Sequence, residues 1–487
     1  MDQIQGFLPD APPDAKGILL DCANIIPFDA GFEGAPTPIA SSLAALAAEC
    51  RGAAVLVKLD GTRRLFAGTQ TKLYEATGTS WTDRSAGGGS YTGSTESRWS
   101  FAQFGDTSIA SNLIDAMQSS ASGAFAAIAG APKAQIVVSA SNNFVIAFHT
   151  NEGTYGDAPD RWWCCAQSDQ TNWTPSVATG ATTGRIVAGE GPLTAALPLG
   201  DYVVAYKRKG LFQGQFVGST NGTWAWPQVR GGDCGCVGQE AVCDIGGAHF
   251  IVGEDTFWIF DGSSPVDVGD GVRNWFRRNS SQTYRYKTKV GYDRQRNLVW
   301  VNYASTNSTG ATDATIVFHV GRKRWGRANF TAEAMLNYAA PGVTIDGLDA
   351  YSSTIDGLPA IPFDSQYWLS GGRAFAYFNT SHQIVVNGGA SAASWFTTGE
   401  TGDDDGVSTL QRARIRWILE PTTATSTGLS RMSSGKAQVA MAAPEPMQED
   451  SSFAVWQEGR WHSVRFDMTG PHQESGYDLA LLQDAMR

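Results

Sequence analysis

The feature that most constrains the fold is a turn that ends in an aromatic residue and recurs along the chain. Trp173, Trp224, Trp275 and Trp325 follow one another at steps of 51, 51 and 50 residues. Trp81 precedes Trp173 by 92 residues, close to twice a slightly shorter unit, and Phe125 lies near the middle of that gap. A coincidence of abundant Trp and Gly is the alternative, but three nearly equal steps in succession favour an internal repeat.

Each repeat contains two apolar strands joined by a short polar or Gly-containing link. The runs "DYVVAYKRKGLFQGQFVG" (201–218) and "GAHFIVGEDTFWIFDG" (247–262) alternate with a period near two, as β-hairpins do. A unit of about 40 to 50 residues built from paired strands is typical of a β-propeller blade. The sequence therefore predicts an all-β fold with a six-bladed β-propeller, and a β-sandwich with uneven strands is the alternative. A further hairpin at 364–379 could be a seventh blade, a completion of the sixth, or a bridge out of the propeller.

Composition supports an all-β chain. Gly (55) and Trp (16) are plentiful among the 487 residues, and only 17% of the residues are charged. Glycine supplies the positive φ of tight turns, and aromatic rings pack well on pleated faces.

The two ends of the chain differ from the repeat. Residues 1–50 hold one strand-like run, and "QRARIRWILE" alternates so that Ala413, Ile415, Trp417 and Leu419 share a face opposite the arginines. We expect an N-terminal segment (1–50) that packs with a C-terminal β-rich platform domain (381–487), and the β-propeller between them (51–380). The segment "GETGDDDG" (399–406) is expected to be a mobile loop.

The formal net charge is −11, and the pI is near 5.1. A tight nucleic-acid binder usually has a basic surface, because its affinity comes largely from displacing counterions from phosphates. The acidic net charge therefore disfavours tight binding of DNA. An acidic channel that repels phosphate groups would still let DNA slide through it. The first residues show no secretory signal, and no apolar run is long enough to span a bilayer. We expect a protein made and kept in a cytosol, or released from it by lysis.

The seven cysteines include one metal-like cluster, Cys234, Cys236 and Cys243, followed by His249. Structural zinc usually requires Cys-x2–4-Cys pairs, and the one-residue gap suits two neighbours on the same face of a strand. We expect buried reduced thiols, with zinc as the alternative. A lone histidine in a strand is also more often packed than catalytic.

No constellation of residues specifies catalysis. A glycosidase needs two carboxylates that face one sugar. The candidates are Asp60, Asp106, Glu190, Asp201, Glu254, Asp261 and Asp293, and no spacing singles out a pair. Most of them stand in turn contexts, where an Asp bonds to its own backbone. The stretch "STNGTWAW" (219–226) partly resembles the Asp-box turn of sialidases but lacks its aspartate, and it serves equally well as the closing turn of a blade.

Three basic clusters and one acidic run are interpreted as surface features. "KRK" (207–209), "GRKRWGR" (321–327) and "NWFRRN" (274–279) are basic within an acidic chain, so we expect charged turn tips that aid solubility or contact an acidic neighbouring subunit. The run "DDD" (403–405) is read as a solvated loop, with cation binding as the alternative. We predict no catalytic, cofactor-binding or metal-binding residues.

The order of several weak motifs resembles the tail hub, or nozzle, proteins of short-tailed bacteriophages. An early "CANIIPFDAGFEGAP" precedes hairpins with "LFAGTQTKLYE" and "YWLSGG", then "WFTTGETG" and "RARIRW", and the chain finishes on "GRWHSVRFDMTGPHQESGYDL". The resemblance covers most of the chain and includes no diagnostic signature.

This resemblance implies a non-enzymatic virion protein, assembled in the host cytoplasm, in which a propeller sits on a platform made by the chain ends. Six copies would form a ring below the portal and its adaptor. Tail fibres or spikes would dock around the ring, and viral double-stranded DNA would pass through it. A sialidase-like glycosidase and a receptor-binding propeller, often trimeric, are the alternatives.

Overall fold

The computed structural model describes residues 2–219, 222–231, 233–338, 352–358, 374–441 and 443–483. Strands dominate these ranges. They also contain one α-helix, α1 (Arg273–Asn279), and the short 3-10 turns η1 (Ala86–Gly88), η2 (Arg285–Lys287) and η4 (Ile355–Gly357). Within the described ranges, no helix has the length and apolarity that a membrane crossing requires.

Six four-stranded antiparallel units follow one another between residues 53 and 328, in the region where the sequence predicts six blades. Blades one and two consist of β7 (Ala53–Val57), β8 (Arg63–Gly68), β9 (Leu73–Thr77), β10 (Ser80–Asp83), β11 (Ser100–Phe104), β12 (Thr107–Ser111), β13 (Gln118–Ser120) and β14 (Ala126–Ala127). Blades three and four consist of β15 (Lys133–Ala140), β16 (Phe144–Glu152), β17 (Gly156–Cys164), β18 (Thr182–Arg185), β19 (Glu190–Leu199), β20 (Tyr202–Lys209), β21 (Leu211–Ser219) and β22 (Gly222–Ala225). Blades five and six consist of β23 (Val242–Asp244), β24 (His249–Val252), β25 (Phe257–Phe260), β26 (Pro265–Asp267), β27 (Lys289–Asp293), β28 (Leu298–Tyr303), β29 (Ala314–His319) and β30 (Arg324–Ala328).

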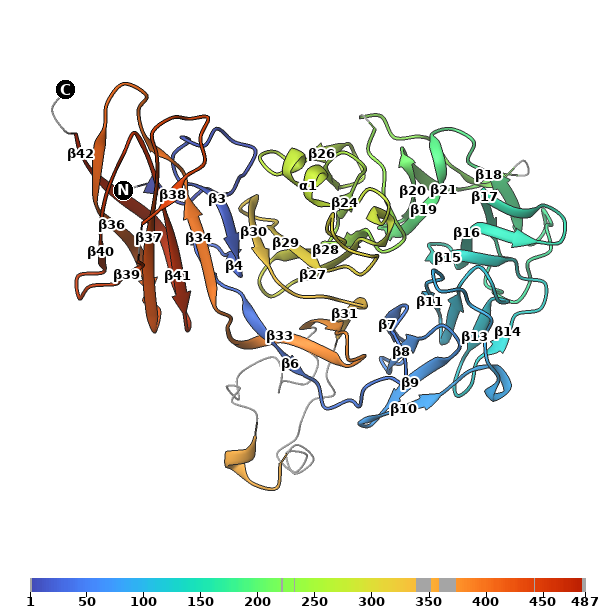
Figure 1. Cartoon of the computed structure of the whole chain (residues 1–487). Helices are drawn as coiled ribbons and strands as arrows, with labels where there is room; N and C mark the ends of the chain where they lie inside the picture. Colours follow the sequence, from blue (N-terminus) through green and yellow to red (C-terminus); the bar gives the residue numbers. More distant parts are fainter. Residues whose placement is uncertain are drawn as a thin grey trace.

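A seventh four-stranded sheet completes the ring. It joins β31 (Ala334–Tyr338), β32 (Ala374–Phe378) and β33 (Ile384–Ser391) to β6 (Pro36–Ala40) from the start of the chain. The first strand of each blade contacts the first strand of the next, and β31 contacts β7 (Figure 1). The β-propeller fold is therefore confirmed. Of the three interpretations of the hairpin at 364–379, the seventh blade is the one that applies to its described part, 374–379, and the rest lies outside the described residues.

Both chain ends form a second group of strands beside the ring. One sheet runs in the order β2 (Gly6–Phe7), β3 (Ile18–Ala23), β34 (Ser394–Thr398), β41 (Trp461–Thr469), β37 (Thr423–Arg431) and β38 (Val439–Ala440), with β35 (Thr401–Gly402) and β39 (Glu445–Pro446) at its sides. A second series extends blade six through β4 (Ile25–Pro27), β5 (Phe32–Gly34), β42 (Gln473–Gln483), β36 (Ser408–Leu419) and β40 (Ser452–Gly459), with β1 (Asp2–Gln3) paired to β42. The first and last described strands, β1 and β42, both belong to this group, and β42 lies at its outer side (Figure 1). We call this group the chain-end sheets.

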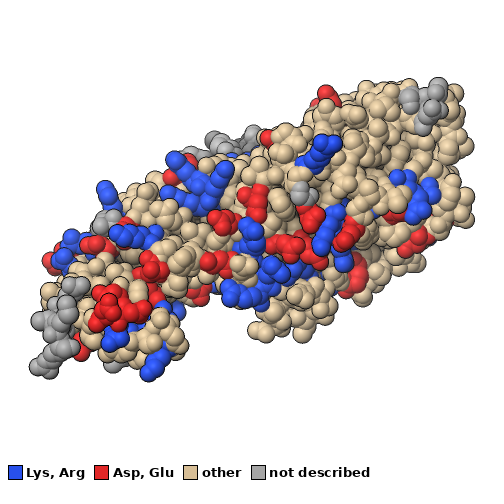
Figure 2. Space-filling view, turned by 90° about the horizontal axis from the view of Figure 1, so that it is seen from above, with Lys and Arg blue, Asp and Glu red and all other residues tan. Residues whose placement is uncertain are grey.

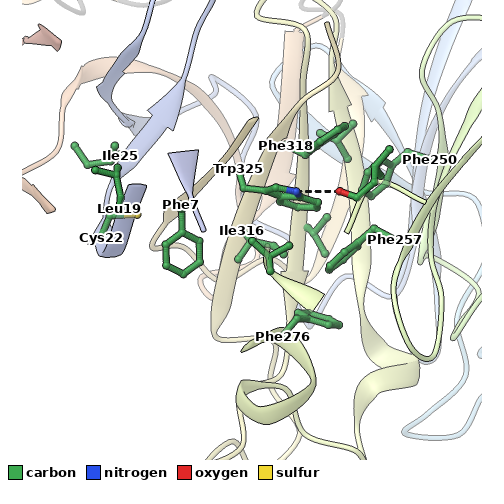
Figure 3. Packing of buried hydrophobic residues seen from close by; sticks show 14 of the residues in the cluster. Phe7, Leu19, Cys22, Ile25, Phe250, Phe257, Phe276, Ile316, Phe318 and Trp325 are labelled. Carbon is green, nitrogen blue, oxygen red and sulfur yellow. Dashed lines mark hydrogen bonds between the residues drawn. The ribbon is translucent and has the colours of Figure 1, made fainter. Parts of the chain in front are cut away.

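The chain-end sheets share one hydrophobic core with blades four to six of the propeller. Trp325 of β30 lies 4.7 Å from the ring centres of both Phe257 and Phe318, and its indole N–H donates to the Val268 carbonyl at 3.1 Å. Phe7 and Ile25 of the N-terminal strands belong to the same cluster (Figure 3). Since the core and the ten-stranded sheet cross the expected boundaries without interruption, the division into an N-terminal segment, a propeller and a separate platform domain stays a proposal.

The aromatic repeat marks the outer part of blades one, two, four and six. Trp81, Trp224 and Trp325 lie in the fourth strand of blades one, four and six, and Phe125 directly precedes the fourth strand of blade two. Trp173 lies in the connection before β18, and Trp275 lies on α1. Trp224 is buried between blades three and four, 5.9 Å from the ring of Phe144, as expected for a packing residue. Thr220 and Asn221 of its turn lie outside the described residues.

Two local expectations for the chain ends need correction. Ala413 and Ile415 are buried in the core, but Leu419 is 48% exposed, because β36 shifts register against β42 on both sides of Trp417. The segment 399–406 is not a loop throughout, because β35 pairs with β41 through Thr401 and His462.

Candidate functional site

A large hollow lies at the propeller axis. Its volume is about 770 Å³, and its wall includes residues from all seven blades or from the segments that enter them. We call it the axial pocket. It is formed by the starts of the first strands and by loops such as the β28–β29 connection, because every blade directs these parts to the same end of the ring.

Five cations and four carboxylates stand in the wall of the axial pocket. Three ion pairs join Arg51 to Glu49 at 2.8 Å, Arg98 to Glu240 at 2.6 Å and Lys287 to Glu96 at 3.0 Å. The fourth carboxylate, Glu333, bonds His382 at 2.6 Å and accepts the Cys50 backbone N–H at 2.9 Å. Every acidic side chain of the pocket therefore already has a partner.

The buried centre of this network is Lys289, the first residue of β27. Its side chain is buried, and its ammonium donates to the Thr312 hydroxyl at 3.0 Å. Burial lowers the pKa of Lys289 to about 8, the nearby Arg98 charge acts in the same direction, and Glu240 and Glu49 oppose the shift. Lys289 therefore remains a cation at neutral pH, in a place where water cannot solvate it fully.

His149 enters the pocket through a β-bulge. The β16–β17 register shifts between Phe148 and Thr150, and His149 has a φ of 48°, which turns its ring out of the strand alternation. The ring contacts the Gln135 side-chain oxygen through Nδ1 and the Asp157 carboxylate through Nε2 at 3.1 Å. Burial lowers the pKa of His149, so the ring favours its neutral form.

None of the carboxylates singled out from the sequence lines the axial pocket. Asp60, Asp261 and Asp293 instead accept backbone N–H groups two residues ahead, at 2.8, 2.9 and 3.0 Å. Asp106 accepts the Leu59 N–H at 3.0 Å, and Glu190 faces Lys209 at 3.8 Å. The turn role is therefore observed for Asp60, Asp261 and Asp293, and none of the seven carboxylates lines the pocket.

The metal-like cluster consists of thiols without a disulfide. Cys234 and Cys236 are buried and Cys243 is half-buried. Burial raises the pKa of Cys236 to about 12. His249 is packed, as expected, with its ring nitrogens bonded to the Tyr206 hydroxyl at 2.7 Å and the Pro198 carbonyl at 3.0 Å. Within the described residues, no three His, Cys, Asp or Glu side chains have a metal-binding arrangement.

The basic clusters contact their own chain. Lys207 is only 2% exposed and lies inside β20, so the expectation of a charged turn tip is wrong for this residue. In the second cluster, Arg322 faces Asp29 at 3.4 Å and Arg327 forms an ion pair with Asp21.

The remaining charged runs are local as well. Arg278 of α1 faces Asp10 at 3.2 Å, and that carboxylate also accepts the Trp275 backbone N–H at 3.1 Å. At the acidic run, Asp403 accepts the Asp405 N–H at 2.9 Å and Asp404 accepts the Trp461 indole N–H at 2.7 Å. Lys and Arg alternate with Asp and Glu on the face seen in Figure 2. That face therefore offers no extended surface of one sign for a nucleic acid.

Sequence reasoning missed the pocket residues, although a signal was present. Arg51, Arg98, Glu240 and Lys287 each stand two positions before the first strand of a blade. A charged residue at the same position in four repeats could have been noticed. It could not be interpreted, because only the closed ring brings those positions together.

A second notable feature is an exposed tryptophan on the chain-end sheets. Trp456 is 67% exposed and lies on β40, which pairs only with β36 and forms the edge of its sheet. A register shift opposite Leu410 and Arg412 gives Trp456 a φ of 36°, a conformation that costs free energy for a bulky residue. The fold thus holds a large aromatic ring in solvent.

No known protein family matches the chain, and no curated protein does. Among solved structures, the chain is similar to YCF48 bound to D1 peptide, at 13% identity over 61% of this chain and 87% of that one, with a TM-score of 0.35. It is also similar to YCF48 from Cyanidioschyzon merolae (12% identity, 58% and 95% covered, TM-score 0.28). An exo-β-1,3-galactanase from Phanerochaete chrysosporium with β-1,3-galactotriose is a third (12% identity, 78% and 95% covered, TM-score 0.23). These TM-scores are too low to support any conclusion about function.

Proposed function

We propose that the protein is a non-enzymatic virion component, a tail hub or nozzle of a short-tailed bacteriophage. In this proposal six copies form a ring below the portal and its adaptor. The ring conducts and gates the genomic double-stranded DNA during ejection and anchors tail fibres or spikes. The resemblance described under Sequence analysis suggests the family, and the chain-end sheets offer the surface for assembly.

The observation that carries this proposal is Trp456 on the open edge of β40. Tryptophan is enriched among the residues that dominate binding energy in protein interfaces. Other large apolar side chains of the chain-end sheets are also exposed: Val407, Ile418, Leu419, Met432, Val439 and Leu482. The Gln457 side chain donates to the Val439 carbonyl at 2.9 Å, so the β38 edge reaches β40 near Trp456. Exposed apolar groups of this kind mark interaction surfaces.

A ring of identical subunits requires two different complementary surfaces on each copy. The edge with Trp456 would be one of them. The propeller exposes apolar side chains of its own on blades three and four, among them Tyr155 at 50% and Val217 at 45%. One continuous ten-stranded sheet joins blade six to β36 and β40, so the edge with Trp456 would keep a constant position relative to blade six during assembly.

The test is the mass of the native protein, measured by native mass spectrometry and by light scattering. A ring of six predicts a particle of about six 52.0 kDa chains. Trp456→Ala should shift the population to smaller species. Leu59→Ala, which removes an 81% exposed side chain from blade one, should leave the six-subunit assembly intact. A wild-type monomer or trimer across a wide concentration range would overturn the proposal.

A glycan-binding or glycan-cleaving propeller, or a receptor-binding one, is the second candidate, and the axial pocket favours it. In the pocket, burial raises the pKa of Glu96, but hydrogen bonds from Tyr286 and Lys287 outweigh burial and hold this pKa below its usual value. Glu96 is therefore poorly suited to donate a proton to a glycosidic oxygen. The isolated chain can be tested for release of reducing ends from a panel of glycans. Release by the wild type and loss of release in Glu240→Gln would favour this candidate over the six-subunit assembly.

A further inference from the structure

The axial pocket contains cations that its own carboxylates do not neutralise. All four carboxylates of its wall have partners, and within the described ranges Lys289 and Arg208 have no carboxylate at ion-pair distance. The whole chain carries a formal charge of −11, so a cationic surplus at the propeller axis is a local feature of this site.

Lys289 is the less solvated of these two cations. Its side chain is 7% exposed, and the Thr312 hydroxyl is its hydrogen-bond acceptor. Thr312 in turn donates to the Ala332 carbonyl at 3.0 Å, which directs its oxygen lone pairs toward the ammonium. Glu240 and Glu49 act on this ammonium only from beyond ion-pair distance. An ammonium removed from water without a close opposite charge is costly, and a bound anion would offset this cost.

Arg98 supplies an unsatisfied donor. Its Nη2 forms an ion pair with the Glu240 carboxylate at 2.6 Å and donates a hydrogen bond to the Glu333 carbonyl at 2.6 Å. Its Nε–H is buried and has no acceptor among the described residues. The charge of Arg98 acts on Lys289, so both groups belong to one electrostatic cluster. Buried N–H groups without an acceptor are rare in proteins and call for an explanation.

We propose that the axial pocket binds a small molecule through an oxyanion group, a carboxylate or a phosphate, which the Lys289 ammonium and the Arg98 Nε–H hold together. The volume of about 770 Å³ suits a molecule larger than the oxyanion alone, since small-molecule sites span about 300–1,000 Å³. Gln135 and Gln239 of the wall, which bond each other across blades three and five, offer amide groups to the rest of the molecule. This inference does not depend on the proposed assembly.

Calorimetric titration with sodium sulfate and with sodium acetate tests the proposal, at an ionic strength kept constant with chloride. Sulfate stands for the phosphate class and acetate for the carboxylate class. We expect saturable binding of at least one of the two at about pH 7, with one site per chain. Tighter binding of sulfate would point to a phosphate ligand, and tighter binding of acetate to a carboxylate ligand. No saturable binding of either anion would overturn the proposal.

Matched variants locate the site. Lys289→Met should weaken binding by about tenfold or more, as expected when a charged hydrogen-bond donor is removed. Lys207→Met is the control, because Lys207 is also a buried lysine but lies outside the axial pocket. Equal affinity in Lys289→Met and the wild type would contradict the assignment.

The pH dependence gives a second readout. Lys289 loses its proton as the pH rises through about 8, so the affinity for the anion should fall from about pH 7 to pH 9 in the wild type. Lys289→Arg keeps its charge in this range and should bind equally at both values. A wild-type affinity that does not change with pH would contradict the role of Lys289.

Partial acetylation of the wild-type chain makes the test independent of variants that do not fold. Mass spectrometry of peptides would then report the rate at each lysine. The bound anion should slow acetylation of Lys289 and leave the exposed Lys16 unchanged. Equal rates at Lys289 with and without the anion would overturn the proposal.

Discussion

At the scale of single residues, aromatic side chains hold neighbouring blades together. Trp224 is 4% exposed in the fourth strand of blade four, and its ring meets Phe144 of blade three at 5.9 Å and Phe216 of its own blade at 6.0 Å. Phe144 lies in the second strand of blade three, so the contact spans two sheets. Trp224 therefore fills a space between two twisted sheets that backbone hydrogen bonds do not join.

Replacement of Trp224 by Ala should destabilise the fold by about 3–5 kcal/mol, because a large cavity would remain between two blades. Chemical unfolding followed by tryptophan fluorescence measures this change. Tyr202→Ala in the same blade is the control, since Tyr202 is 39% exposed and its loss should cost less than about 1 kcal/mol. Unchanged stability of Trp224→Ala would show that this ring does not stabilise the contact between the blades.

At the scale of elements, the junction between β30 and β4 connects the propeller to the chain-end sheets. Among the described residues, the two strands pair through one residue pair, Arg327 with Ile25. The absent side chain of Gly326 allows β30 to approach β4 closely. A Cβ on Gly326 would lie 2.4 Å from the Ile25 carbonyl oxygen and 2.8 Å from the Pro27 ring. Backbone atoms on the opposite strand leave such a group no room.

Gly326→Ala should therefore separate β4 from β30 and cost about 1–3 kcal/mol, in the range of overpacked sites. Hydrogen exchange should increase in β4 and β5 and remain slow in blades one to three. Gly388→Ala is a matched control, because a Cβ at Gly388 would meet nothing within 4 Å. Normal protection of β4 in Gly326→Ala would mean that the junction tolerates the extra methyl group.

At the scale of the whole molecule, the chain-end sheets share their hydrophobic core with blades four to six. The largest cluster joins Phe7 and Phe32 of the N-terminal strands to Phe257 of blade five and Phe466 of β41. The ten-stranded sheet runs through the same region. Unfolding of either part would expose apolar surface of the other part.

We therefore expect the chain-end sheets and blades four to six to unfold together in one cooperative transition in differential scanning calorimetry. The dilute chain, below the concentration at which it assembles, is the sample for this measurement. A separate transition of the chain-end sheets would instead support a platform domain that folds independently of the propeller.

Most of the propeller could be predicted from the sequence, because a blade is built from hairpins. Hairpin strands such as β20 and β21 are close in sequence, so their alternation and the turn between them report their pairing directly. The turn roles of Asp60 and Asp261 were equally readable, because each carboxylate bonds a backbone group two residues away.

Pairing between strands that are distant in the sequence follows from the folded chain alone. Closure of the ring pairs β6 with β33, and Thr37 donates to the Ala390 carbonyl across 353 residues of sequence. The axial pocket likewise brings Arg98, Glu240 and Lys289 together from three blades. Local periodicity shows that a strand has an apolar face but does not show which distant edge it will join, because many edges satisfy the same backbone hydrogen bonds. The sequence by itself therefore determined the repeated blade, and the closed ring determined the pocket and the attachment of the chain ends.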